Sequence, residues 1–224
     1  MREKSAIPRN RPRQRIHFDT MQEASTRKIY DVQSLVYDYT FGALVTKRIG
    51  RAIEHMKIQP GETVLDVGIG TGGSLPYYPK HAKVLGVDLS SGMLREARKK
   101  IVEESRYDNI TVFQGNALEL PFEDSSFDLV LCLEVLEHIP DPAPALKELA
   151  RVCRGDLVLS VPSEPWFRLG SLARGKYMSG WGNHPEHVNH WNLRSFREFL
   201  AARTEVVSVE RSTPWIVAHA RPSG

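Results

Sequence analysis

The sequence predicts an α/β fold with a mostly parallel sheet of seven strands, helices on both faces and an antiparallel hairpin at one edge. Short β-rich apolar runs alternate with amphipathic stretches from residue 63 to residue 161, which is typical of βαβ units with right-handed crossovers. The alternation stops near the C-terminal end, where two strands follow each other across a short connection. The length of 224 residues fits one such domain with an appendage.

The spacing of apolar residues defines the individual elements. Between residues 24 and 56 apolar side chains recur every three or four positions, which predicts two helices, and Pro60-Gly61 ends the second one. Further along, runs rich in Val, Ile, Leu and Phe predict strands, and a return to the helical period predicts helices. The expected strands are 63–67, 83–88, 110–114, 127–133, 156–161, 205–209 and 215–220, and the later helices are 92–103, 143–152 and 194–202.

The composition predicts a cytoplasmic protein. Hydrophobic residues make up 41% and charged residues 25% of the chain, as in soluble globular proteins. No apolar run approaches the roughly 18 residues that span a bilayer, and no hydrophobic stretch follows the charged N-terminus. Cys132 and Cys153 lie in apolar stretches without metal-binding spacing, so we expect two reduced, buried thiols.

The first residues of the chain are strongly basic. Residues 1–15 carry six basic residues and one acidic residue, and Pro8 and Pro12 prevent a regular helix. A flexible, solvated tail is the simpler interpretation, and peripheral contact with an anionic membrane is the alternative. No aromatic residue precedes Phe18, and Lys and Arg are not grouped on the main domain. Nucleic acid is therefore not expected as a partner.

A glycine-rich loop follows the first strand of the domain. Residues 66–73 read DVGIGTGG, and Asp88 ends the second strand twenty residues after Gly68. Glycines let the backbone approach a ligand closely, and a carboxylate at the end of the second strand accepts hydrogen bonds from ribose hydroxyls. The spacing of Gly68, Gly70 and Gly73 fits a dinucleotide as well as other adenosine cofactors.

Asp66 favours one adenosine cofactor over the others. A carboxylate just before the loop would oppose the pyrophosphate of a dinucleotide. S-adenosylmethionine (SAM) has no phosphate there and carries an ammonium and a sulfonium, so an acidic side chain is favourable directly or through water. The alternative is that Asp66 only ties down the loop backbone.

Four ordered motifs then resemble those of the class I SAM-dependent methyltransferases, the group that contains quinone-biosynthesis C-methyltransferases and many bacterial small-molecule methyltransferases. The likeness covers about residues 60–165 and implies the Rossmann-like class I methyltransferase fold. The motifs are VLDVGIGTG at 64–72, GVDLSSGML at 86–94, GNALELPF at 115–122 and FDLVLCLEVLEHI at 127–139.

The resemblance also implies roles for single residues. In that family the glycine loop holds the methionyl part of SAM, the Asp88 position binds the ribose, and residues after the second and third strands lie near the adenine. Asn116 stands where most members have Asp, and its amide oxygen is still able to accept a hydrogen bond from the adenine amino group. The expected cofactor contacts are Asp66, Gly68, Gly70, Gly72, Asp88, Leu89, Met93, Asn116, Ala117 and Leu133.

The acceptor pocket is expected beyond the carboxyl ends of the strands. The N-terminal helices, the turn at 134–140 and the long stretch at about 162–192 are able to reach it. This last stretch is rich in Trp and His, which favours a lid or acceptor-binding insertion over a purely stabilising cap. The chain then divides into a basic flexible tail (1–22), N-terminal helices (23–59) and a SAM-binding domain with that insertion (60–224).

The histidines of the insertion are not expected to bind a metal. Spacings of three do not place His184, His187 and His190 on one helical face, and Pro185 disrupts a helix there. Related small-molecule methyltransferases have similar histidines before a helix, which favours His187 or His190 as a pocket group and a base near neutral pH. His138 is a third candidate. The sequence does not select one of the three as the catalytic base.

The predicted function is methyl transfer from SAM to a small-molecule or lipid-like acceptor by in-line displacement, with S-adenosylhomocysteine as product and no metal. Two alternatives stay open. Residues 30–42 and LPYYP at 75–79 are similar to bacterial phospholipid N-methyltransferases, which act at a membrane surface. A SAM-binding subunit without catalysis, stabilised by a partner chain, is the other.

Overall fold

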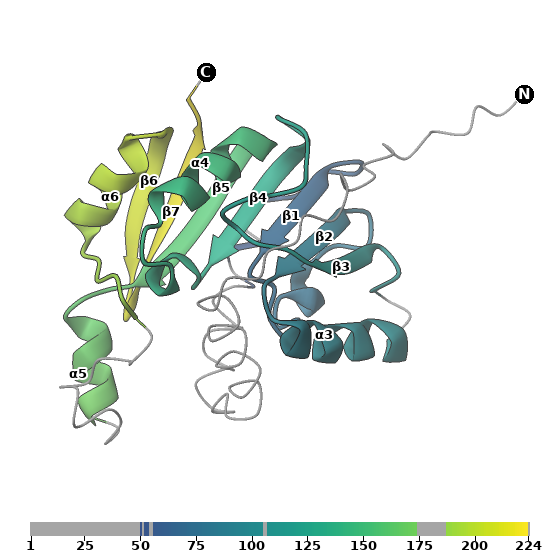
Figure 1. Cartoon of the computed structure of the whole chain (residues 1–224), viewed down its shortest axis with the longest axis horizontal. Coiled ribbons are helices and arrows are strands. Elements are labelled where there is room, and N and C mark those ends of the chain that lie inside the picture. Colours follow the sequence, from purple (N-terminus) through teal and green to yellow (C-terminus); the bar gives the residue numbers. More distant parts are fainter. Residues whose placement is uncertain (1–49, 51, 54–55, 105–106, 174–186, 224) are drawn as a thin grey trace, which may run out of the picture.

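A computed structural model of the chain describes residues 50, 52–53, 56–104, 107–173 and 187–223 (Figure 1). The predicted tail, nearly all of the two N-terminal helices and the middle of the 162–192 segment, with His184, lie outside these residues.

The sheet has the predicted seven strands in the order β3-β2-β1-β4-β5-β7-β6. The first five strands pair in parallel, and β7 pairs antiparallel with both β5 and β6, so the hairpin at one edge is confirmed. The order reverses direction at β1, which places β1 and β4 side by side at the centre of the sheet. The strands are β1 (Thr63–Val67), β2 (Lys83–Asp88), β3 (Ile110–Gln114), β4 (Phe127–Leu133), β5 (Cys153–Pro162), β6 (Thr204–Ser212) and β7 (Trp215–Pro222).

Helices lie on both faces of the sheet, as predicted. Figure 1 shows α3 near β2 and β3 and α6 beside β6. Among the described residues, the 3-10 turn η1 lies between β1 and β2, and the 3-10 turn η3 follows shortly after β4. Among the described residues, no helix is long and apolar enough to cross a membrane. The helices and turns are η1 (Leu75–Tyr77), α3 (Ser91–Glu103), η3 (Leu136–His138), α4 (Ala143–Val152), α5 (Trp166–Ala173) and α6 (Leu193–Ala201).

Alternate residues of the strands supply two apolar cores. In β1, Leu65 belongs to the core that contains α4 and α6, whereas Val64 belongs to the core that contains α3. Successive side chains of a strand point to opposite faces, so one apolar strand serves both cores. Cys132 and Cys153 are buried and free, as expected for reduced thiols.

The fifth strand begins earlier than the sequence predicts. It starts at Cys153 rather than residue 156, because two contacts with β4 extend the pairing. The Arg154 guanidinium donates two hydrogen bonds of 2.7 Å to the Asp128 carboxylate. A Cβ on Gly155 would lie 2.2 Å from the carbonyl oxygen of Asp128, so only glycine allows this close approach.

Helix α5 is not among the predicted elements. It lies within the expected insertion and has only eight residues with a glycine inside, so its helical period is too short to recognise in the sequence.

Candidate functional site

The carboxyl ends of the central strands carry most of the predicted cofactor residues. Asp66 lies next to the last residue of β1, Asp88 ends β2, and Leu133 ends β4. The registers pair Asp66 with Gly86 on one side and with Leu131 on the other. Parallel strands end at the same edge, so these residues meet where an open α/β sheet binds its ligands.

The glycine loop has a backbone that other residues rarely adopt. Gly68, Gly70 and Gly72 have φ values of +84°, +58° and +79°. A Cβ on Gly68 would lie 2.2 Å from Cγ2 of Val135, which is too close for any side chain. Glycine at position 68 therefore lets the loop pack directly on the segment that follows β4.

Asp88 holds the loop with both of its oxygens. Oδ2 accepts a hydrogen bond from the Gly70 N–H at 2.9 Å, and Oδ1 accepts one from the Ser90 N–H at 2.8 Å. Burial raises the pKa of this carboxyl above its usual value, against the lowering effect of the backbone donors. Each carboxylate oxygen has a second acceptor position. The residue therefore keeps the capacity to bind both hydroxyls of a ribose.

Asp66 ties down the chain after the glycine loop. Its Oδ2 accepts hydrogen bonds of 2.7 Å from Ser74 Oγ and from the Tyr78 hydroxyl. The side chain is 4% exposed, and burial raises its pKa despite these two donors. The sequence left open whether Asp66 faces the cofactor or only ties down the loop backbone, and these bonds show a structural role of another kind, to two side chains after the loop. Ser74 and Tyr78 are contributors that the sequence pattern does not predict, although Tyr78 lies in the LPYYP segment.

The predicted adenine side is formed by the ends of β2 and β3 and the start of α3. Met93 lies in the first turn of α3, and its Sδ is 3.7 Å from the position of a Cβ on Gly70. The Leu89 carbonyl accepts a hydrogen bond of 2.8 Å from Gln114 Nε2. Asn116 Oδ1 accepts one of 3.0 Å from the Leu118 N–H. The second acceptor position of that oxygen fits an adenine amino group.

Two of the three predicted histidines come together, and the third does not. The rings of His138 and His187 have centroids 5.0 Å apart and meet edge to face. Their nitrogens and a carboxylate oxygen of Glu137 all lie within 4.8 Å of one another. His190 is largely exposed and lies outside this group. The partial burial that it has, and the charge of the nearby Arg168, lower its pKa. Glu137 is a member of the cluster that sequence reasoning did not single out.

The aromatic residues of the expected insertion divide between core and surface. Trp191 packs against Phe196 and Phe199 of α6, with ring centroids 5.5 and 4.8 Å apart. Phe167 is buried beside His187, with centroids 4.9 Å apart. Trp166 is 44% exposed. Trp181 and Tyr177 lie outside the described residues, so the lid stays a prediction.

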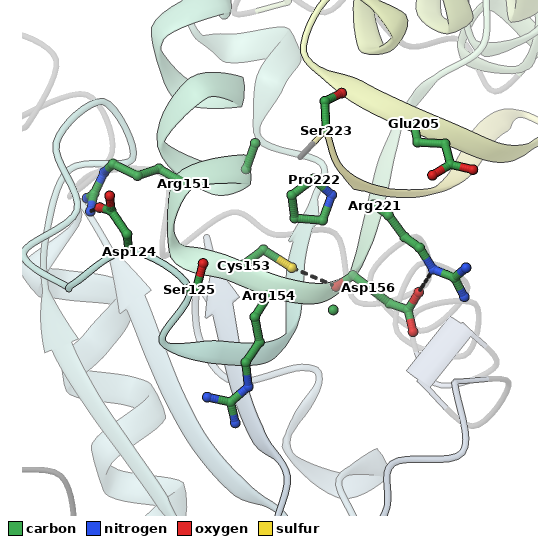
Figure 2. A pocket seen from close by; sticks show the side chains of 12 residues that line it. Asp124, Ser125, Arg151, Cys153, Arg154, Asp156, Glu205, Arg221, Pro222 and Ser223 are labelled. Atoms are coloured by element: carbon green, nitrogen blue, oxygen red, sulfur yellow. Dashed lines mark hydrogen bonds and ion pairs between the residues drawn. The ribbon is translucent and has the colours of Figure 1, made fainter.

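A separate hollow lies at the opposite end of the sheet (Figure 2), where β5 begins and β7 ends. Its arginines are paired with carboxylates: Arg151 with Asp124 at 2.7 Å and Arg221 with Asp156 at 2.9 Å. These pairs neutralise the charges that would attract an anion. The hollow is remote from the carboxyl ends of the parallel strands, where ligands bind in this architecture.

Comparison with known proteins agrees with this geometry. A family described as a methyltransferase domain matches residues 65–159. A demethylmenaquinone methyltransferase of Bacillus cereus (strain B4264) is 33% identical over 174 residues, which cover 74% of this chain and 70% of that protein. A phosphatidylethanolamine N-methyltransferase of Cereibacter sphaeroides is 37% identical over 126 residues, 55% of this chain and 62% of that protein.

A solved structure shows the same fold. The magnesium protoporphyrin IX methyltransferase of Synechocystis PCC 6803, solved with bound S-adenosylhomocysteine, superposes with a TM-score of 0.70 at 21% identity. The match covers 90% of this chain and 100% of that one. With the glycine loop, Asp88 and the strand order already in place, the chain belongs to the class I SAM-dependent methyltransferase family.

Proposed function

We propose that this protein transfers a methyl group from SAM to a small-molecule or lipid-like acceptor by in-line displacement. The observation that carries the proposal is the arrangement at one sheet edge of a glycine loop with positive φ at Gly68, Gly70 and Gly72 and of a carboxylate, Asp88, with spare acceptor positions. His138 ends η3, three residues after Val135, on which Gly68 of the loop packs, and His187 lies beside His138.

The residues of the chain have mainly a positioning task. Bound SAM supplies a methyl group already activated by a sulfonium, so holding the acceptor in line and excluding water account for much of the rate. Asp88 orients the ribose, and the loop backbone fits the methionyl part. His138 and His187 are placed to accept a proton when the acceptor is an oxygen or carbon acid.

The first experiment is calorimetric titration of the full chain with SAM, beside an Asp88→Ala variant. We expect micromolar binding by the wild type and at least a tenfold loss in the variant, because two hydroxyls lose a charged acceptor. Asp108→Ala is the matched control, since Asp108 is an exposed aspartate of the same domain. Absence of SAM binding by the folded wild type would contradict the proposal.

Phospholipid N-methylation is a second candidate. The Cereibacter sphaeroides relative, whose name gives phosphatidylethanolamine as acceptor, supports it. The test uses radiolabelled SAM with vesicles of phosphatidylethanolamine and phosphatidylcholine, against vesicles of phosphatidylcholine alone. Label in the lipid only with the first kind of vesicle would support this acceptor. Label only in a soluble acceptor would contradict it, and SAM binding without any turnover would favour the non-catalytic subunit.

A further inference from the structure

Glu137, His138 and His187 form a compact set of metal-ligating side chains. One carboxylate oxygen and one nitrogen of each imidazole all lie within 4.8 Å of one another. Two histidines and one carboxylate are the protein ligands of many catalytic zinc and non-haem iron sites, which keep further positions open for water or substrate. The type and number of ligands therefore fit a divalent transition-metal ion.

The backbone holds the distant histidine in place. Val188 and Asn189 donate backbone hydrogen bonds of 2.9 and 3.2 Å to the carbonyl of Glu137. The Asn189 side chain donates a further bond of 2.6 Å to the Ile139 carbonyl. These bonds fasten the segment after residue 186 to η3, and His187 meets His138 as a result. Because these bonds already fix the main chain of both segments, no backbone rearrangement is needed to bring the three side chains around an ion.

Burial and charge favour a cation at this point. Glu137 is 1% exposed and His187 is 8% exposed, so these two ligands are shielded from water, whereas His138 is partly exposed. Burial raises the pKa of the Cys132 thiol most, and the charges of Glu137, Asp66 and Glu134 raise it further. Glu137 lies in η3 and Glu134 shortly before it, and neighbouring carboxylates favour a positive ion.

We propose that Glu137, His138 and His187 bind a divalent first-row transition-metal ion beside the cofactor loop. Zinc bonds of about 2.1 Å place tetrahedral ligands about 3.4 Å apart. The three ligand atoms lie within 4.8 Å of one another, so binding requires them to approach by at most about 1.4 Å. Val135, one residue before η3, packs against Gly68 of the cofactor loop. An ion here has open coordination positions for an oxygen of the acceptor. Metal binding by the three residues is independent of the proposed function, whereas binding of the acceptor by the ion rests on it.

The test is calorimetric titration of chelator-stripped, full-length protein with zinc chloride, with the bound metal counted by elemental analysis. We expect one equivalent bound with micromolar or tighter affinity. His187→Ala and the isosteric Glu137→Gln should each weaken this binding at least tenfold. His190→Ala is the matched control, because it removes an exposed imidazole three residues from His187 that lies outside the cluster, and it should leave the affinity unchanged.

Cobalt(II) gives a second measurement that needs no variant. Bound to two imidazoles and a carboxylate with low coordination number, cobalt(II) should show visible absorption bands. These bands should disappear when added zinc displaces the cobalt. The proposal would be overturned if the wild type formed no one-to-one zinc complex. It would also be overturned if the folded His187→Ala and Glu137→Gln variants bound zinc as tightly as the wild type.

SAM titration of the stripped protein keeps the two proposals separate. Unchanged SAM affinity in the variants shows that they are folded. If the protein binds SAM but not zinc, only the metal site is contradicted. If it binds zinc but not SAM, only the proposed function is contradicted.

Discussion

Single glycines decide whether the loop after β1 is able to form. Gly61 and Gly68 both have positive φ, at +93° and +84°. They differ in surroundings, because a Cβ on Gly61 meets nothing within 4 Å, whereas one on Gly68 would lie 2.2 Å from Val135. A substitution at Gly61 therefore reports only the cost of positive φ, whereas one at Gly68 adds the cost of steric overlap with Val135.

We predict that Gly61→Ala lowers the free energy of unfolding by about 1–2 kcal/mol, the cost of left-handed backbone. Gly68→Ala should cost about 1–3 kcal/mol more, because it also overpacks against Val135, and it should weaken SAM binding. Urea unfolding measures both changes. The double variant Gly68→Ala/Val135→Ala should recover part of the steric cost, and equal costs for the two single variants would contradict this explanation.

At the scale of elements, Asp128 joins three strands. Its Oδ2 accepts hydrogen bonds from the Thr63 N–H of β1 at 2.8 Å and the Thr63 hydroxyl at 3.0 Å, and its carboxylate pairs with Arg154 of β5. Partial burial raises the pKa of this carboxyl, but Arg154 and the Thr63 donors outweigh it and hold the pKa below the usual value. The charged form is therefore the one that the folded state prefers.

Asp128→Asn should lower the free energy of unfolding by about 1–2 kcal/mol at neutral pH, a modest value because Arg154 is half exposed. A lowered pKa in the folded state adds stability above the unfolded pKa, and this stability disappears as the pH falls through the folded pKa. The difference between variant and wild type should shrink between about pH 5 and the folded pKa. Urea unfolding at several pH values measures it, and a difference that stays constant into strong acid would contradict the assignment.

For the whole molecule, the cofactor site spans the central strands, so its ligand should stabilise the entire domain. A ligand at 100 times its Kd adds about 2.7 kcal/mol, which for a domain of this size raises the Tm by roughly 5–10 °C. We predict this shift with SAM, and at most about half of it for Asp88→Ala at the same SAM concentration, because the affinity falls at least tenfold. Thermal unfolding monitored by circular dichroism measures it. An equal shift with NADH would contradict the preference for SAM over a dinucleotide.

The sequence by itself predicts the parts that depend on local pattern. Strand and helix order follow from apolar period, and the turn at Gly68 and Gly70 follows from glycines at fixed offsets from a strand. The carboxylate of Asp88 is recognisable because the chain passes from β2 straight into α3. The seven-stranded sheet and the cofactor family are both confirmed. Both were predictable because the individual strands and the cofactor motifs are encoded by residues close together in the chain.

Only the tertiary structure decides which distant residues meet. The sequence offered His138, His187 and His190 as candidates without choosing one as the base, and the bonds from Val188 and Asn189 to the Glu137 carbonyl bring the first two together. The partners of Asp66 were likewise set by the path of the chain through η1. No period or spacing encodes such contacts, because they depend on where separate elements pack, and packing is a property of the whole core.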